Sequence, residues 1–130
     1  MILVDTSAWI EFLRDTGSPV CEEVDRLVEA GATTTDPISM EIFAGARDDH
    51  HLRNLRGLLA RAQFLRCESG DYESAALLYR SCRSGGHTIR KLIDCLIAAV
   101  AIRHSVPVLH ADVDFDILAS HTDLRLHSPD

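Results

Sequence analysis

The 130-residue sequence lacks the features that mark membrane, exported and zinc-binding proteins. No apolar stretch approaches the roughly 20 residues of a transmembrane helix. The first apolar run ends at Asp5, which leaves no room for the apolar core of a signal peptide. The four cysteines form no Cys-x-x-Cys pair, and the seven histidines lack ligand spacing. We therefore expect a cytoplasmic protein with reduced cysteines and no membrane association.

Lysine is nearly absent, because twelve basic residues are arginine and only Lys91 is lysine. The net charge of −7 argues against nucleic-acid binding driven by overall charge. Arginine forks nevertheless pair well with phosphate or carboxylate. The basic residues gather in two groups: Arg53, Arg56, Arg61 and Arg66, and Arg80, Arg83, Arg90 and Lys91. Each group is either a solvated helix face or a contact surface for a phosphate backbone.

Short apolar runs alternate with longer helical patterns along the chain. A length of 130 residues with 46% hydrophobic content predicts a single domain over residues 1–130. We expect strands over 2–4, 32–35, 64–67 and 106–109, with an edge strand over 124–126. Helices are expected over 6–13, 20–30, 38–46, 48–63, 69–84, 88–104 and 116–120. Trp9, Ile10 and Leu13 have core spacing in the first of them, and Ile89 and Leu92 belong to the expected core stripe of the long helix near the end. This alternation predicts an α/β protein, a three-layer α/β/α sandwich with a mostly parallel central sheet.

Asp5 ends the run Ile2-Leu3-Val4, whose composition is typical of a strand buried on both faces. Open α/β sheets bind ligands beyond the carboxyl ends of their strands, where Asp5 would lie. Asp is also a good N-cap, so Asp5 could simply begin the helix at Thr6. Both interpretations stay open until the other acids are considered.

Asp94 and Glu41 are acids in apolar surroundings. The helix expected over 89–103 is apolar nearly all round from Leu92 to Ile102, and Asp94 is its only charge there. Such a helix is buried, and a buried carboxylate needs an arginine partner or a metal ion. Glu41 is the sole charge between Asp36 and Arg47, so it either faces the same site or lies on a narrow polar face with Ser39.

Three aspartates alternate with apolar residues directly after the strand expected over 106–109. They are Asp112, Asp114 and Asp116. We expect Asp114 or Asp116 to cap the following helix and Asp112 to face the site. Together with Asp5, Glu41 and Asp94, these acids predict an all-oxygen site for Mg²⁺ or Mn²⁺. Such a site can activate water and stabilise the leaving oxygen in phosphoryl transfer.

With these acids assembled, the chain resembles PIN-domain ribonucleases, and among them the VapC-type toxins of bacterial toxin–antitoxin pairs. Four segments carry the resemblance and span essentially the whole chain: residues 2–9, 38–45, 92–99 and 109–115. The resemblance implies a Mg²⁺- or Mn²⁺-dependent endoribonuclease with acidic site residues at Asp5, Glu41, Asp94 and Asp112. It also implies a supporting Asp114, an assisting hydroxyl at Thr6, a homodimer, and a small VapB-type antitoxin that plugs the acidic pocket.

The mechanism we expect has Asp5, Asp94, Asp112 and Asp114 holding the metal. Glu41 would complete the pocket or act on the attacking water, and cleavage in line would leave 5′-phosphate and 3′-hydroxyl ends. Transfer, ribosomal and messenger RNA are all candidate substrates.

Two other functions compete with this one. A phosphatase with Asp5 as nucleophile, in the haloacid-dehalogenase manner, would need a second Asp where Ser7 stands. A non-enzymatic module could use the acids to hold a structural cation or a basic partner.

Overall fold

A four-stranded parallel sheet lies at the centre of the computed structural model, which describes residues 1–129. The strands are β1 (Leu3–Val4), β2 (Thr33–Thr35), β3 (Gln63–Leu65) and β4 (Val108–Leu109), in the order β3-β2-β1-β4. All three pairings are parallel, with Leu3 opposite Thr33 on one side and Val108 on the other. The predicted edge strand over 124–126 appears only as a single parallel bridge between Val108 and Leu126.

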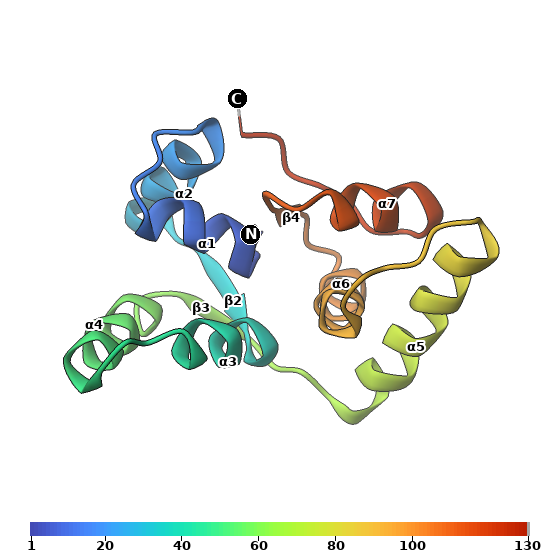
Figure 1. The fold of residues 1–130 in the computed structure, drawn as a ribbon, viewed down its shortest axis with the longest axis horizontal. Helices are drawn as coiled ribbons and strands as arrows, with labels where there is room; N and C mark the ends of the chain where they lie inside the picture. The colour runs from blue at the N-terminus through green and yellow to red at the C-terminus, as the bar shows by residue number, and fades with distance from the viewer. Residues whose placement is uncertain (130) are drawn as a thin grey trace.

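Seven helices flank this sheet in the described part of the chain, which confirms the predicted fold class. They are α1 (Thr6–Leu13), α2 (Pro19–Ala30), α3 (Asp36–Ala44), α4 (Asp49–Leu59), α5 (Ser69–Ser84), α6 (Leu92–His104) and α7 (Val113–His121). In Figure 1, α1 to α4 lie on the left, and α5, α6 and α7 gather on the right. Over residues 1–129, no helix is long and apolar enough to cross a membrane.

Local sequence signals explain where several helices begin. Ser18 caps α2 through a bond from the Cys21 amide to its hydroxyl, and Pro19 occupies the first turn, where its missing N–H costs nothing. Asp48 caps α4 in the same way by accepting the amide of His51. Gly31 ends α2 with a φ of 126°, a conformation that side chains other than glycine's rarely adopt.

Helix α6 runs through the core, as its apolar sequence predicts. Every residue from Asp94 to Ala101 is buried, and α6 packs against α5, α7 and α3. Trp9 from α1, Ile38 from α3 and Phe115 from α7 are fully buried in the same core. Asp94 is thereby placed among apolar side chains at the first turn of α6.

Several sequence expectations about the helices were wrong. The helix expected over 48–63 ends at Leu59, and the helix expected over 116–120 begins at Val113. The last long helix begins at Leu92, not near Thr88, because the amide of Arg90 bonds the Asp114 carboxylate instead of a helical carbonyl. Ile89 is buried outside the helix, whereas Leu92 is 60% exposed. Ile10 and Leu13, expected in the core, are partly exposed because α1 turns that face toward a pocket.

Candidate metal centre

Two of the predicted acids come from neighbouring strands of the sheet. Asp5 directly follows β1, and Asp112 lies three residues beyond β4. The two strands pair in register, and the amide of Asp5 donates to the carbonyl of Leu109 at 3.0 Å. Because the carboxyl ends of parallel strands meet at one edge of a sheet, the two acids lie at that same edge.

Asp5 serves as a helix cap and keeps one carboxylate oxygen free. Its Oδ2 accepts the amide of Ser7 at 2.9 Å and the hydroxyl of Ser7 at 2.6 Å. Its Oδ1 is buried and has no hydrogen-bond partner among the described residues. Burial raises the pKa of Asp5 above its usual value, and the negative charge of Glu41 adds to the effect. An orphaned buried oxygen is costly unless a ligand satisfies it.

Asp94 shows the same anomaly more strongly. The residue is 2% exposed, and its Oδ2 is buried without a partner in residues 1–129. Burial raises the pKa of Asp94 to about 7, and the charge of Asp5 contributes further. A salt bridge to arginine was the alternative explanation for a buried Asp94, and no ion pair to this residue is found in the described part of the chain.

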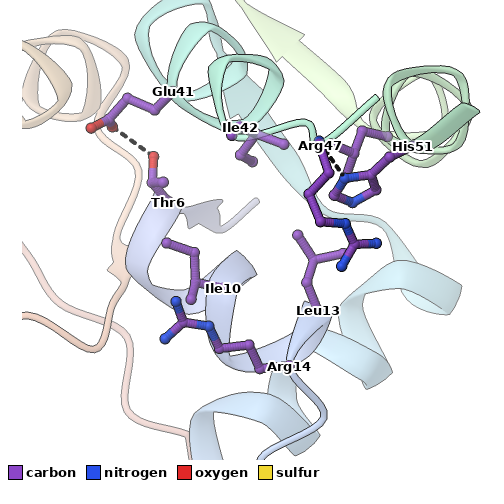
Figure 2. Close-up of a pocket in the computed structure, with 10 residues that line it drawn as sticks. Thr6, Ile10, Leu13, Arg14, Glu41, Ile42, Arg47 and His51 are labelled. Carbon is purple, nitrogen blue, oxygen red and sulfur yellow. Dashed lines mark hydrogen bonds between the residues drawn. The ribbon is translucent and has the colours of Figure 1, made fainter. Parts of the chain in front are cut away.

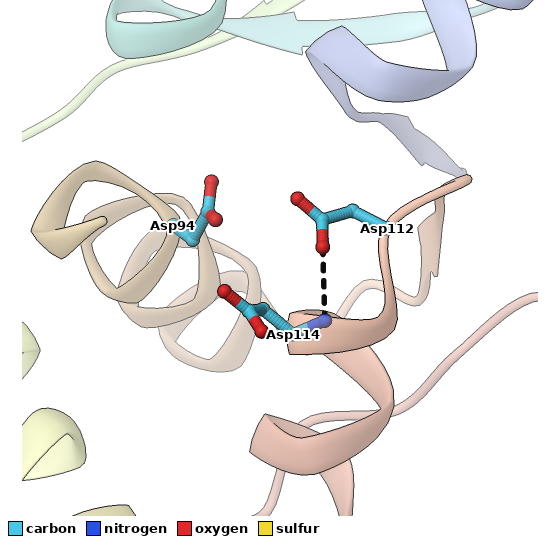
Figure 3. A group of neighbouring side chains, drawn as sticks. All are labelled: Asp94, Asp112 and Asp114. Carbon is cyan, nitrogen blue, oxygen red and sulfur yellow. Dashed lines mark hydrogen bonds between the residues drawn. The ribbon is translucent and has the colours of Figure 1, made fainter. Parts of the chain in front are cut away.

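Asp94, Asp112 and Asp114 converge on one point, as Figure 3 shows. One carboxylate oxygen from each lies within 4.8 Å of those of the other two. The cap of α7 is Asp112, which accepts the amide of Asp114 at 3.0 Å, so our assignment of the cap to Asp114 or Asp116 was wrong. Asp116 is exposed and lies 3.3 Å from His110.

Arg90 binds both acids at the start of α7, a contact that sequence reasoning missed. Its Nη2 donates to Oδ1 of Asp112 at 2.7 Å, and its Nε donates to Oδ2 of Asp114 at 3.0 Å. The backbone amide of Arg90 reaches the same Asp114 oxygen at 3.1 Å. The bond to Asp114 raises the pKa of Arg90, so the guanidinium is firmly cationic.

Glu41 lies at the border of the site. Its Oε1 accepts the Thr6 hydroxyl at 2.7 Å, which links α3 to α1 (Figure 2). Its negative charge contributes to the raised pKa of both Asp5 and Asp94, so it lies close enough to interact with both. Glu41 is not a member of the three-acid group within 4.8 Å.

Ser7 connects the two halves of the site and was also missed. Its hydroxyl donates to Asp5 and accepts the amide of Ala111 at 2.9 Å. This contact joins residues 104 positions apart in the sequence. A Ser two residues after a strand-end Asp, in the run Asp5-Thr6-Ser7, was the only signal that could have indicated the role.

A pocket of about 370 Å³ opens beside Glu41 (Figure 2). Its apolar lining includes Ile10, Leu13 and Ile42, and the side chains of Arg14 and Arg47 lie on it away from Glu41. The acidic site is therefore adjoined by an apolar surface, and Arg14 and Arg47 place positive charge on the far side of that surface.

The donor set fits a hard divalent cation. Only carboxylates converge, and oxygen ligands suit Mg²⁺, Mn²⁺ or Ca²⁺ rather than softer metals. The unpartnered oxygens of Asp5 and Asp94 supply buried negative charge that a cation would neutralise. The site has the composition and the electrostatics of a divalent metal centre.

Comparison with known proteins identifies related chains. Residues 2–120 match the model of the PIN domain. Ribonuclease VapC11 of Mycobacterium tuberculosis is 44% identical over 132 residues, covering 98% of each chain. Ribonuclease VapC51 of the same organism is 31% identical, covering 92% of this chain and 86% of its own.

Solved structures show the same fold. FitAcB from Neisseria gonorrhoeae superposes with a TM-score of 0.78 at 23% identity. The match covers 99% of this chain and 98% of that chain. The DNA-bound VapBC complex from Salmonella typhimurium gives a TM-score of 0.78 at 16% identity, with 98% of this chain and 97% of that chain covered.

Proposed function

Because the chain belongs to the PIN-domain family, and within it to the VapC ribonucleases, we propose that it is a Mg²⁺- or Mn²⁺-dependent endoribonuclease that acts as the toxin of a toxin–antitoxin pair. The observation that carries the proposal is the pair of buried, unpartnered carboxylate oxygens on Asp5 and Asp94. The family match favours this function over a phosphatase and over a binding module.

The carboxylates of Asp5, Asp94, Asp112 and Asp114 would hold the metal. When bound, the metal supplies a polarised water at neutral pH and positive charge for the phosphate oxygens. Asp94 lies on a rigid buried helix, and Asp112 and Asp5 are fixed by hydrogen bonds to backbone amides. The protein thus presents its oxygens in a fixed arrangement that needs little reorganisation during the reaction.

Glu41 would orient the water that attacks phosphorus, opposite the leaving oxygen. Thr6 holds one Glu41 oxygen through its hydroxyl, so the other oxygen remains for the water. Attack in line would leave 5′-phosphate and 3′-hydroxyl ends. In this scheme Asp5, Glu41, Asp94 and Asp112 are the catalytic residues.

A small VapB-type antitoxin would neutralise the enzyme. VapBC and FitAB complexes are among the structural neighbours. A partner with a basic side chain for the acids and apolar residues for the adjoining pocket would complement the surface beside Glu41. We further propose that the toxin forms a homodimer and acts in the cytoplasm, where RNA is found.

Incubation of the purified protein with total cellular RNA tests the proposal. Cleavage is expected with Mg²⁺ or Mn²⁺, with loss of cleavage in EDTA and in Asp94→Asn. Asp116→Asn is the matched control, because Asp116 is an exposed acid on the neighbouring helix α7, outside the group of converging carboxylates, and it should cleave normally. A folded Asp94→Asn protein that still cuts RNA would overturn the assignment, and mapping the 5′ ends of the products would identify the substrate.

A further inference from the structure

Arg90 is an exposed cation fixed at the edge of the acidic cluster. Its side chain is 65% exposed although it is bonded to Asp112 and Asp114. An arginine side chain usually loses conformational entropy when it binds a ligand, which weakens the binding. Here the two aspartates and the bond from the Arg90 amide have already ordered it.

The bonds of Arg90 leave the acids available for the metal. Asp112 uses Oδ1 for both Arg90 and the Asp114 amide, and Asp114 uses Oδ2 for both Arg90 bonds. Within residues 1–129, Oδ2 of Asp112 and Oδ1 of Asp114 have no hydrogen-bond partner. Arg90 therefore shares the cluster with a metal ion rather than blocking it.

The guanidinium also retains unused donors. Arginine carries five N–H groups, and Arg90 uses one on Nε and one on Nη2. Over the described residues, both N–H groups of Nη1 and one of Nη2 have no partner. They form an exposed edge with the geometry that binds phosphate through two hydrogen bonds.

We propose that Arg90 binds a phosphate of the RNA next to the metal site, held in position by Asp112 and Asp114. The inference rests on the proposed ribonuclease function and names a residue that contacts its substrate. Lys91 is exposed at the next position, so the edge of the site carries two adjacent cations.

The contact should depend on the metal. Without metal, the carboxylates of Asp5, Glu41, Asp94, Asp112 and Asp114 outnumber the cations around them and repel a phosphate. A divalent ion reduces this repulsion, so Arg90 and the metal should strengthen RNA binding together.

Fluorescence anisotropy with a short fluorescein-labelled single-stranded RNA of mixed sequence tests the inference. Ca²⁺ replaces Mg²⁺, because it takes the same oxygen ligands, and gels verify that the RNA stays intact. In Ca²⁺, Arg90→Gln should weaken binding roughly 5-fold and reduce the slope of log K against log salt by about 0.7, the value for one phosphate contact on a single strand. In EDTA, Arg90→Gln and wild type should bind alike.

Two further variants control for charge. Arg90→Lys keeps the positive charge and should retain most of the salt slope. Arg26→Gln removes another exposed arginine that pairs with a carboxylate, Glu23, and should leave the slope unchanged in Ca²⁺. An Arg90→Gln protein with the wild-type slope in Ca²⁺ would overturn the inference.

A thermal-shift titration with Mn²⁺ separates this role from a purely structural one. Arg90→Gln should keep the Mn²⁺-induced rise in Tm of wild type. Loss of that rise would show that Arg90 only braces the metal ligands, and would overturn phosphate binding. Failure of the wild-type protein to bind RNA in any metal would instead overturn the proposed function, and this inference with it.

Discussion

The hydroxyl of Thr6 donates a 2.7 Å hydrogen bond to Oε1 of Glu41. Thr6 is the first residue of α1 and the neighbour of Asp5, whereas Glu41 belongs to α3. One short side chain thus fixes the position of a long one at the border of the acidic site. Glu41 has several rotatable bonds, and without this contact its carboxylate would sample many positions.

Replacing Thr6 with Val should therefore lower RNA cleavage while leaving the fold intact. The change keeps the shape of the side chain and removes the hydroxyl, so Glu41 loses its anchor. We expect kcat to fall about tenfold, the value of one hydrogen bond, and Tm to change little. Thr6→Ser should keep near-normal cleavage, and full activity in Thr6→Val would show that the anchor is unimportant.

Asp94→Asn should stabilise the metal-free protein at high pH. The folded pKa of Asp94 is about 7 against an ordinary value of 3.8, so the folded state binds this proton more tightly than the unfolded state. Below both pKa values, Asp94 does not lower the free energy of unfolding. The loss of stability grows as pH rises from about 4 to 7 and stays constant above pH 7. In EDTA at about pH 8, Asp94→Asn should gain on the order of 4 kcal/mol in the free energy of unfolding, at about 1.4 kcal/mol for each pH unit between the two pKa values.

The same comparison at about pH 4 provides the control, because both proteins are then neutral at this position and should have similar stability. Mg²⁺ should stabilise wild type and have little effect on Asp94→Asn, since a ligand that binds only the folded state stabilises it. A wild-type protein more stable than Asp94→Asn at the higher pH would contradict the assignment of an unpaired buried acid.

The ion pair between Asp71 of α5 and Arg103 of α6 should be important for stability. Asp71 is 2% exposed and accepts Nε and Nη2 of Arg103 at 2.8 and 2.9 Å, which holds its pKa below the usual value. Asp71→Asn should cost about 2 to 3 kcal/mol in urea denaturation, because it leaves Arg103 without its charge partner. Glu68→Gln, which alters an exposed partner 3.6 Å from the same arginine, should cost under about 0.5 kcal/mol.

Two glycines should respond to alanine in opposite directions. A Cβ at Gly85 would collide with the imidazole of His121, which itself bonds His87 at 3.1 Å. Gly85→Ala should lower the free energy of unfolding by about 1 kcal/mol because that ring is displaced. Adding His121→Ala should recover the lost stability.

Gly57 lies inside α4 with open space around its Cβ position. Gly57→Ala should raise stability by roughly 0.5 to 1 kcal/mol. Thermal denaturation of both alanine variants beside the wild-type protein checks the two opposite signs.

The site acids were predictable because each interrupts an apolar pattern. Asp94 is the only charge between Leu92 and Ile102 of a helix whose residues 94–101 are all buried, and Asp5 and Asp112 follow buried strands whose ends meet at one edge. These signals are local, so one sequence was enough to find them. Their role as metal ligands remains a prediction.

Contacts between distant segments were not predictable in the same way. Arg90 is 24 residues from Asp114, and only the packing of α7 beside the segment before α6 brings them together. The same contact explains the error at Thr88, where local capping preference favoured an earlier helix start than tertiary hydrogen bonding permits. For Ile10 and Leu13, helical spacing identified an apolar face but could not show that a pocket lies against it.

The Ser7 bridge to Ala111 has a consequence for how activity arises during synthesis. The segment that carries Asp112 and contacts Ser7 is synthesised more than a hundred residues after Asp5. A nascent or partly folded chain therefore has no assembled catalytic centre and cannot damage the RNA of the cell that makes it. Catalytic activity therefore requires closure of the sheet, which brings the segments of Asp5 and Asp112 together.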